Sequence, residues 1–244
     1  MRATTSSRTS SSATPSGTGG SGLPRLKGVN TAGYDFTVKT DGSFTGTGST
    51  PPTSQFPHFA SQGFGLMNEP HDMPAIAPWV QAVQAAVNAI RAAGANSQII
   101  LIPGSSWSSA AALPGEAGPQ LLTVTDPAGG VSKLVFDVHK YLDVDNSGTH
   151  DECTTDNLGV FQTLVSWLKQ NNRQAILSET GGGHTQSCYT ALNSQLAYIK
   201  NNYPTMLGFT VWSAGAFATT YELSVTPNAD GSDQQLWIQA VKPN

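Results

Sequence analysis

The feature that most constrains the fold is an alternation of short apolar runs with amphipathic segments, which is regular from about residue 97 onward. Near-continuous apolar runs bounded by turn-forming residues are typical of strands buried on both faces of a parallel sheet. These runs cover residues 98–103, 134–139, 175–179 and 207–212. The segments with helical periodicity cover residues 76–93, 158–170, 186–201 and 233–241. Two earlier runs, 25–30 and 63–68, bring the predicted strands to six.

Repeated strand–helix units indicate either a closed barrel or an open doubly wound sheet. An open nucleotide-binding sheet would carry a glycine-rich phosphate loop. Neither GxGxxG nor GxxxxGK[ST] occurs, and Gly181-Gly182-Gly183 fits neither. Polar residues instead follow several predicted strands: Asn68, Glu69, His139, Tyr141, Glu179 and Trp212. Active sites of (β/α)8 barrels are built at these carboxyl ends. We therefore predict an α/β fold of the TIM-barrel type.

The first 22 residues have a different composition. Ser, Thr, Gly and Pro dominate them, and no apolar residue larger than Ala follows Met1. Such a stretch cannot bury enough surface to offset its ordering entropy. We predict a disordered linker over residues 1–22 and one globular domain over residues 23–244.

Charge and hydropathy exclude several classes of partner. The net charge is −4 and only 11% of residues are charged, which argues against nucleic acid. No apolar run is long enough to cross a membrane. The Met1 start shows no export signal either, because linker-like sequence follows it directly.

The two cysteines, Cys153 and Cys188, fit no zinc-binding spacing. Composition alone leaves open whether they are separate thiols or a disulfide. The segment Asp143-Val-Asp-Asn-Ser-Gly148 imitates the start of a calcium loop, but its twelfth position is Thr154 rather than Glu. We interpret it as an ordinary loop and predict neither metal nor cofactor.

Two carboxylates stand out among the strand-end residues. Glu69 occurs in Leu66-Met-Asn-Glu-Pro-His71 and Glu179 in Leu177-Ser-Glu-Thr-Gly181. Barrel closure would direct both toward one pocket, and a facing pair of carboxyl groups is what glycoside hydrolysis requires. Taken without any resemblance, His139 is better interpreted as a hydrogen-bonded core histidine. Trp212 is compatible with a core position, although an indole at a strand end also suits the apolar face of a sugar.

These two motifs, with Phe136-Asp-Val-His-Lys-Tyr141 and Gly208-Phe-Thr-Val-Trp212, resemble those that follow strands 4, 7, 6 and 8 of glycoside hydrolase family 5. The chain is most similar to fungal endoglucanases of that family, from about Leu23 to the end. The resemblance implies that Glu69 is the acid/base and Glu179 the nucleophile. It implies sugar-binding roles for Asn68, His139, Tyr141, Trp212 and Trp107. It also implies a disulfide between Cys153 and Cys188.

The sequence departs from the family between its first two runs. Only 37 residues separate Asn30 from Asn68. Residues 53–62 resemble the first barrel helix and pass directly into the Asn-Glu-Pro run. The family's strand 2 with its arginine and strand 3 with its histidine have no counterpart, so we expect a barrel shortened between about residues 62 and 65.

By this resemblance we expect a secreted, monomeric, retaining endo-β-1,4-glucanase that acts on cellulose and related β-glucans. Its partner would be the polysaccharide, and a cellulose-binding module would precede the linker in a longer form. Two alternatives remain open from the sequence. One is a catalytically impaired relative that binds glucan, and the other is a mannanase or another β-glycanase of the family.

Overall fold

The computed structural model describes residues 26–31, 36–38, 44–46, 63–215 and 220–244. The predicted linker over residues 1–22 and the helix-like segment 53–62 lie outside these ranges. Among the described residues, no helix is both long and apolar enough to span a bilayer.

Six parallel strands form one sheet in the order β1-β8-β7-β6-β5-β4. Their bounds are β1 Leu26–Thr31, β4 Gly63–Gly65, β5 Ile99–Pro103, β6 Leu134–His139, β7 Ala175–Glu179 and β8 Met206–Ala214. The first strand pairs with the last, as in a closed barrel, but β1 and β4 remain the two edges of the sheet. The prediction of an incomplete barrel with six strands is confirmed. A separate antiparallel pair, β2 Phe36–Val38 and β3 Phe44–Gly46, was not predicted.

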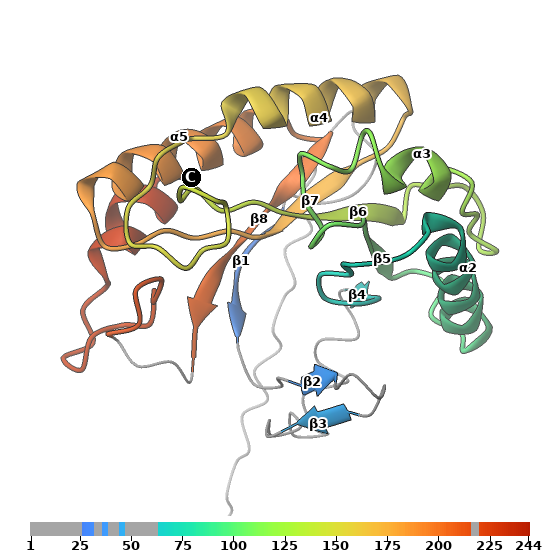
Figure 1. Cartoon of the computed structure of the whole chain (residues 1–244), viewed down its shortest axis with the longest axis horizontal. Helices are drawn as coiled ribbons and strands as arrows, with labels where there is room; N and C mark the ends of the chain where they lie inside the picture. Colours follow the sequence, from blue (N-terminus) through green and yellow to red (C-terminus); the bar gives the residue numbers. More distant parts are fainter. Residues whose placement is uncertain (1–25, 32–35, 39–43, 47–62, 216–219) are drawn as a thin grey trace, which may run out of the picture.

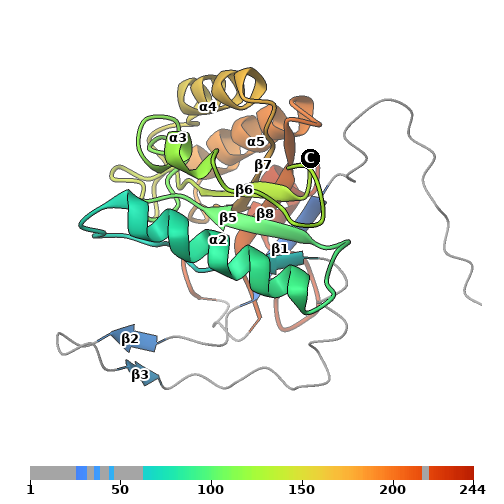
Figure 2. The same cartoon turned by 90° about the vertical axis from the view of Figure 1, so that its right-hand side faces the viewer.

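The helices lie on the outer side of the curled sheet (Figure 1). They are α2 Ile76–Ala92, α3 Ala117–Leu121, α4 Leu158–Gln170, α5 Gln186–Asn201 and the π-helix η2 Trp237–Val241. A quarter turn of the molecule brings α2 to the front of the sheet (Figure 2). The predictions of α2, α4 and α5 are confirmed, and α3 was missed. The predicted last helix, residues 233–241, is replaced by the shorter η2.

The alternation of side chains along each strand separates two apolar layers. In β6, Phe136 and Val138 belong to the main core that also contains residues of α4 such as Leu164. Val135 points the other way and packs with Ile99, Ile176 and Leu207 of the neighbouring strands. The inner side of the sheet is therefore apolar near the amino ends of the strands.

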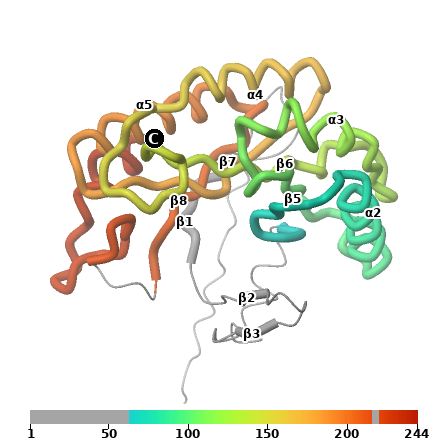
Figure 3. The backbone as a smooth tube through the Cα atoms, in the orientation of Figure 1, coloured from blue at the N-terminus to red at the C-terminus, as the bar shows by residue number. Residues whose placement is uncertain are grey.

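At the carboxyl ends the inner side chains become polar, as Asp137 and His139 show in β6. Two long loops follow these ends, residues 104–116 after β5 and 140–157 after β6 (Figure 3). They stand above the polar end of the sheet, where the candidate site lies.

The strand predicted over residues 63–68 is shorter than expected. It leaves the ladder after Gly65, and one further bond runs from Leu66 N to the Leu101 carbonyl. Among the described strands, β4 pairs with β5 alone. Glu69 has a φ of 45° and Pro70 has no N–H to donate, so extended pairing cannot continue through them. Glu69 therefore lies in a loop beyond the strand.

Candidate active site

The two predicted carboxylates come together at the carboxyl end of the sheet. Glu69 lies in the loop after β4, and Glu179 is the last residue of β7. An oxygen of each carboxylate and a ring nitrogen of His139 all lie within 4.8 Å of one another. This short separation matches a retaining glycosidase pair, because an inverting pair stands about 6.5–9.5 Å apart.

His139 links the two acids. Its Nδ1 lies 2.7 Å from Oε1 of Glu69 and 3.8 Å from Oε2 of Glu179. The ring is buried, and burial alone would lower its pKa. The hydrogen bond to Glu69 and the charges of Glu179 and Asp137 outweigh burial and raise the pKa of His139. The residue is therefore both buried in the core and part of the site.

Tyr141 holds Glu179 from the side. Its hydroxyl donates a 2.7 Å hydrogen bond to Oε1 of Glu179. Burial and the nearby Glu179 charge raise the pKa of Tyr141, so the phenol keeps the proton that it donates. Burial also raises the pKa of Glu179, although His139 and the Tyr141 bond act against it. Within the described residues, no Lys or Arg forms an ion pair with either carboxylate.

A buried polar network fixes the strand ends behind the site. Thr180 Oγ1 donates to the Lys140 carbonyl at 2.6 Å and accepts from Gln195 Nε2 at 2.8 Å. Asn157 Nδ2 donates to Gln195 Oε1 and to the Tyr141 carbonyl, both at 2.9 Å. The network connects the ends of β6 and β7 to α5, so it sets where Tyr141 and Glu179 stand.

A cleft of about 570 Å³ opens beside Glu69, His139 and Tyr141. Trp107 lies on its wall with 51% of its surface exposed, and its ring stacks on His71 at 4.6 Å and 6°. The backbone N–H of Trp107 donates to the Pro70 carbonyl, and this bond joins the Trp107 loop to the loop of Glu69. An exposed, fixed indole suits the apolar face of a sugar ring.

A second cleft of about 310 Å³ lies on the inner side of the sheet. Asn68, Asp137, Ser178 and Glu179 line it, and His139 lines both clefts. Asn68 is exposed and makes no hydrogen bond to the described residues. The predicted sugar-binding residues Asn68, His139 and Tyr141 thus surround the carboxylate pair.

Trp212 is the exception, because it lines neither of these two clefts. Its backbone N–H donates to the Thr180 carbonyl at 2.7 Å, one residue after Glu179. Its indole Nε1 donates to the Tyr221 hydroxyl at 3.2 Å. The backbone of Trp212 is therefore bonded next to the nucleophile candidate, while its indole contacts Tyr221.

Sequence reasoning missed several residues of the site. Asp137 lies inside β6, where an acid in an apolar run was a usable signal, and its Oδ1 lies 3.9 Å from His139 Nε2. Asn146 and Ser147 lie in the segment 143–148, which we interpreted as an ordinary loop, and Tyr221 comes from a loop without a motif. Ser106 was missed for the same reason, although its hydroxyl donates to Glu116 and helps to shape the Trp107 loop.

The predicted disulfide is confirmed. Cys153 and Cys188 are bonded across a sequence separation of 35 residues and join the loop after β6 to α5.

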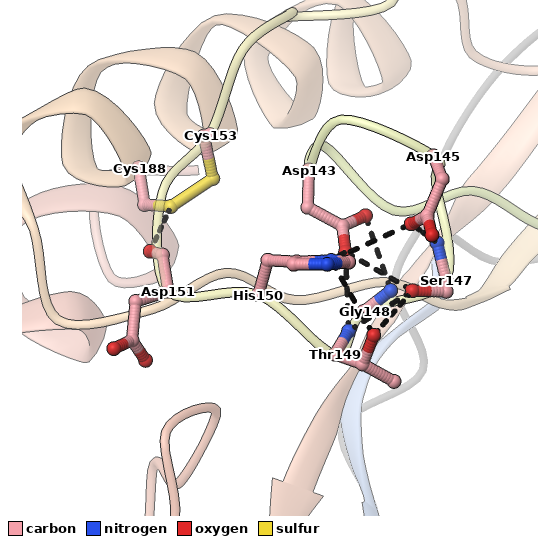
Figure 4. A network of polar contacts seen from close by, with 9 residues as sticks. All are labelled: Asp143, Asp145, Ser147, Gly148, Thr149, His150, Asp151, Cys153 and Cys188. Atoms are coloured by element: carbon pink, nitrogen blue, oxygen red, sulfur yellow. Dashed lines mark hydrogen bonds and ion pairs between the residues drawn. A yellow bond between two sulfur atoms is a disulfide. The ribbon is translucent and has the colours of Figure 1, made fainter.

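In the part of the chain that the structure describes, two groups of side chains have donor atoms close enough for a metal ion: Glu69, His139 and Glu179, and Asp143, Asp145 and His150. In the second group, the buried Asp143 carboxylate accepts from the N–H groups of Gly148 and Thr149 and from the Ser147 hydroxyl (Figure 4). It also lies 2.9 Å from His150 Nδ1, and these bonds hold its pKa below the ordinary value. The loop's own donors thus occupy the oxygens of Asp143 that a metal would need.

Comparisons with known proteins agree with the site. A family model described as Cellulase (glycosyl hydrolase family 5) matches residues 54–215. The manganese dependent endoglucanase Eg5A of Phanerodontia chrysosporium is 51% identical over 327 aligned residues, which cover 97% of this chain and 84% of that protein. Endoglucanase 1 of Saitozyma flava is 59% identical over 181 residues, which cover 74% of this chain and 52% of that protein.

Solved structures show the same likeness. The crystal structure of Cel5A (EG2) from Hypocrea jecorina superposes with a TM-score of 0.71 at 45% identity, covering 80% of this chain and 64% of that one. XacCel5A in complex with cellopentaose gives a TM-score of 0.68 at 35% identity, with coverages of 76% and 61%.

The lengths differ, however. The chain spans about half of the Saitozyma flava protein and less than two thirds of either solved structure. The alignment with the Phanerodontia protein has 327 positions and this chain has 244 residues, so at least 83 positions lack a counterpart here.

Proposed function

This chain belongs to the cellulase family known as glycosyl hydrolase family 5, and we propose that it is a retaining endo-β-1,4-glucanase. The observation that carries the proposal is the approach of the Glu69 and Glu179 carboxylates to within 4.8 Å, beside a cleft with an exposed tryptophan. The substrate would be an internal β-1,4 bond of cellulose or a related β-glucan. The names of the relatives, which are endoglucanases, support this choice.

The surroundings of the two acids support different roles. Glu179 is the more buried, with 14% of its side chain exposed, and the Tyr141 hydroxyl fixes one of its oxygens. A fixed carboxylate is suited to attack the anomeric carbon and form the glycosyl-enzyme intermediate. Glu69 is more open, with 27% of its side chain exposed. It would protonate the leaving oxygen and then activate the water that hydrolyses the intermediate.

The sugar would be bound by neutral side chains. The side-chain amide of Asn68 lies in the same cleft as Glu179 and makes no hydrogen bond to the described residues. It can therefore bond a hydroxyl of the sugar under attack. His139 and Tyr141 would contact the same sugar, and Trp212 would close its subsite. Trp107 would stack on a glucose unit on the leaving-group side. The cellopentaose bound to XacCel5A supports a chain-like ligand for the cleft.

The Phanerodontia relative is named as manganese dependent, so we tested the two candidate metal groups for fit. Asp143 is saturated by donors of its own loop. Oxygens of Glu69 and Glu179 already accept from His139 and Tyr141, and the reaction needs the others. The residues present therefore do not fit a manganese ion.

We further propose that the protein acts outside the cell. A disulfide is stable in an oxidising compartment, and the chain contains one between its only two cysteines.

A second candidate function is glucan binding without turnover. Two observations favour it: the sheet ends at β1 and β4, and no Lys or Arg among the described residues pairs with Glu179. We propose that the chain lacks the segment with strands 2 and 3 between about residues 62 and 65. The positions of the Phanerodontia protein that have no counterpart here support this proposal.

The experiment that separates these candidates compares Glu179→Ala and Glu69→Ala with the parent chain. Glu179→Ala should abolish turnover of both carboxymethylcellulose and an aryl cellobioside. Glu69→Ala should lose activity on the polymer and keep much of its glycosylation rate on the aryl substrate, whose phenol leaves without protonation. Added azide should then speed deglycosylation of Glu69→Ala and yield a β-glycosyl azide.

An α-azide from Glu179→Ala would show that the two roles are reversed. A parent chain that releases no sugar, yet is retained by cellulose, would establish the binding function instead.

A further inference from the structure

Arg173 is a buried arginine that forms no ion pair with any acid among the described residues. It lies between α4 and β7 with 5% of its surface exposed. Its Nη2 donates to the Leu134 carbonyl at 3.2 Å, and its guanidinium carbon lies 4.6 Å from the Phe136 ring centroid. Its Nε is buried and has no hydrogen-bond partner. Burial lowers the pKa of Arg173 to about 10, which leaves it charged at neutral pH.

Arg91 is a second buried arginine, and its guanidinium is fully hydrogen-bonded. Arg91 is also 5% exposed, but its Nε and Nη2 donate to the two oxygens of Asp126 at 2.9 and 2.8 Å. Its Nη1 donates to the Ala95 carbonyl. Every nitrogen of Arg91 has an acceptor, whereas Arg173 has one backbone acceptor for a guanidinium with five N–H donors. A buried charge with unpaired donors destabilises the fold, and a bound anion would compensate the charge of Arg173.

A cleft of suitable size lies next to Arg173. It has a volume of about 630 Å³ and lies at the amino ends of β6, β7 and β8. Arg173 and Lys169 line it, together with Ser132, Gln174 and Thr205, and none of its lining residues is an acid. The cleft therefore has two cations, neutral hydrogen-bonding groups and no negative charge.

We propose that this cleft is a binding site for a small oxyanion, held by Arg173 and Lys169. A guanidinium binds phosphate or carboxylate oxygens through paired N–H donors, and an adjacent ammonium adds charge without fixed geometry. The site is at the opposite end of the sheet from Glu69 and Glu179, so its occupant would be a stabilising ligand rather than a substrate. The oxyanion could be inorganic phosphate or an organic carboxylate, which share this chemistry.

The test measures the Tm of the full chain at pH 7 while sodium phosphate replaces sodium chloride at constant ionic strength. A parallel series uses sodium acetate. Phosphate should raise Tm saturably, by about 3–6 °C at ten times its Kd. A larger rise with acetate than with phosphate would assign the site to carboxylates.

Three substitutions locate the site. Arg173→Met should remove the anion-dependent rise, and Lys169→Met, an exposed change, should weaken the apparent affinity about three- to tenfold. Lys200→Met removes a half-buried lysine of α5 that donates to the Pro243 carbonyl outside the cleft, so it should retain the parent response to anions.

Without anions, the two buried arginines should behave differently. Arg173→Met should leave Tm unchanged or raise it, because it removes an uncompensated charge. Arg91→Met should lower Tm, because it leaves Asp126 buried without its partner. The proposal is overturned if phosphate has no effect beyond ionic strength. It is equally overturned if Arg173→Met keeps the parent response, or if it lowers Tm as much as Arg91→Met does.

Discussion

At the scale of single residues, the charge at the candidate site depends on one imidazole. Asp137 and Glu179 both have raised pKa values, and burial is the main cause for each. His139 lies within 4 Å of both and of Glu69, and its charge lowers the pKa of Asp137 and Glu179. A protonated His139 therefore favours the ionised form of the nucleophile candidate.

The raised pKa of Glu179 predicts how its replacement changes stability. A carboxyl whose folded-state pKa is raised contributes stability below its unfolded pKa and loses that contribution as pH rises through its folded pKa. At pH 7 the ionised Glu179 thus destabilises the fold. Glu179→Gln should raise the free energy of unfolding in urea at pH 7, and the gain should fade toward pH 4.

The matched control is Glu222→Gln, whose side chain makes no hydrogen bond or ion pair to the described residues. It should leave unfolding unchanged at both pH values. Equal stability of Glu179→Gln and the parent at pH 7 would show that Tyr141 and His139 fully compensate the buried charge.

Residue identities at the site were predictable where a motif and a strand end coincided. Glu69 and Glu179 follow apolar runs, so parallel pairing brought them together. The contact between His139 and Glu69 was not predictable, because it depends on the left-handed turn at Glu69. The direction of the Trp212 indole depends on Tyr221, which lies in a loop that sequence periodicity does not describe.

At the scale of elements, the loop after β6 packs closely against the glycines that lead from β7 into α5. A Cβ at Gly182 would come within 2.8 Å of Cys153 Sγ and 2.9 Å of Cys188 Sγ. One at Gly183 would lie 2.2 Å from the Asp151 carbonyl oxygen. The glycine run after Glu179 therefore makes room for the disulfide and for the loop.

The disulfide should contribute measurably to stability. Replacing both cysteines in Cys153→Ala/Cys188→Ala opens a loop of 35 residues. By chain entropy this should lower the free energy of unfolding by about 3–4 kcal/mol. Urea unfolding with and without a reducing agent measures it. The double variant should no longer respond to the reductant, and a parent that does not respond either would contradict the prediction.

The buried network behind the site gives a second element-scale prediction. Gln195→Leu keeps much of the side-chain volume but removes one of the two partners of Thr180 Oγ1 and one of the two partners of Asn157 Nδ2. Losing these two buried hydrogen bonds should cost about 1–3 kcal/mol of stability. The rate on an aryl cellobioside should fall as well, because Tyr141 and Glu179 lose their fixed backbone. Gln239→Leu on the exposed surface of η2 is the control, and comparable losses in both variants would refute a specific role.

Elements were predictable in proportion to their length and periodicity. The buried strands β5 to β8 were evident because their apolar runs are continuous, and α4 and α5 match their predicted bounds. The helix α3 has only five residues and contains Pro119, so it shows no helical period. β4 is short because the left-handed turn at Glu69 and the missing N–H of Pro70 end its pairing, and the apolar run 63–68 does not reveal that turn.

At the scale of the whole molecule, the main question is what an incomplete barrel can do. Closure gives every strand two neighbours and removes exposed edges, but here the sheet ends at β1 and β4. The two catalytic candidates differ in how their strands are supported. Glu69 follows the edge strand β4, while Glu179 ends the interior strand β7. The position of Glu69 is thus the one that would depend most on the strands that we propose are missing.

Restoring the missing strands should therefore change stability and activity together. We would insert, between residues 62 and 63, the part of the Phanerodontia protein that carries the two strands that we propose are missing, taken from the 83 or more positions without a counterpart here. If the insert pairs with β1 and β4, the urea m-value should rise by about a third, in proportion to the chain length that folds. Release of sugar from carboxymethylcellulose should rise by at least about tenfold. A β4 that is paired on both sides would hold Glu69 within hydrogen-bond reach of the leaving oxygen, and general acid–base catalysis depends on that distance. An insert with the same residues in scrambled order controls for length alone. An unchanged m-value would show that the segment does not dock. A higher m-value with unchanged activity would show that six strands already suffice to position Glu69 and Glu179.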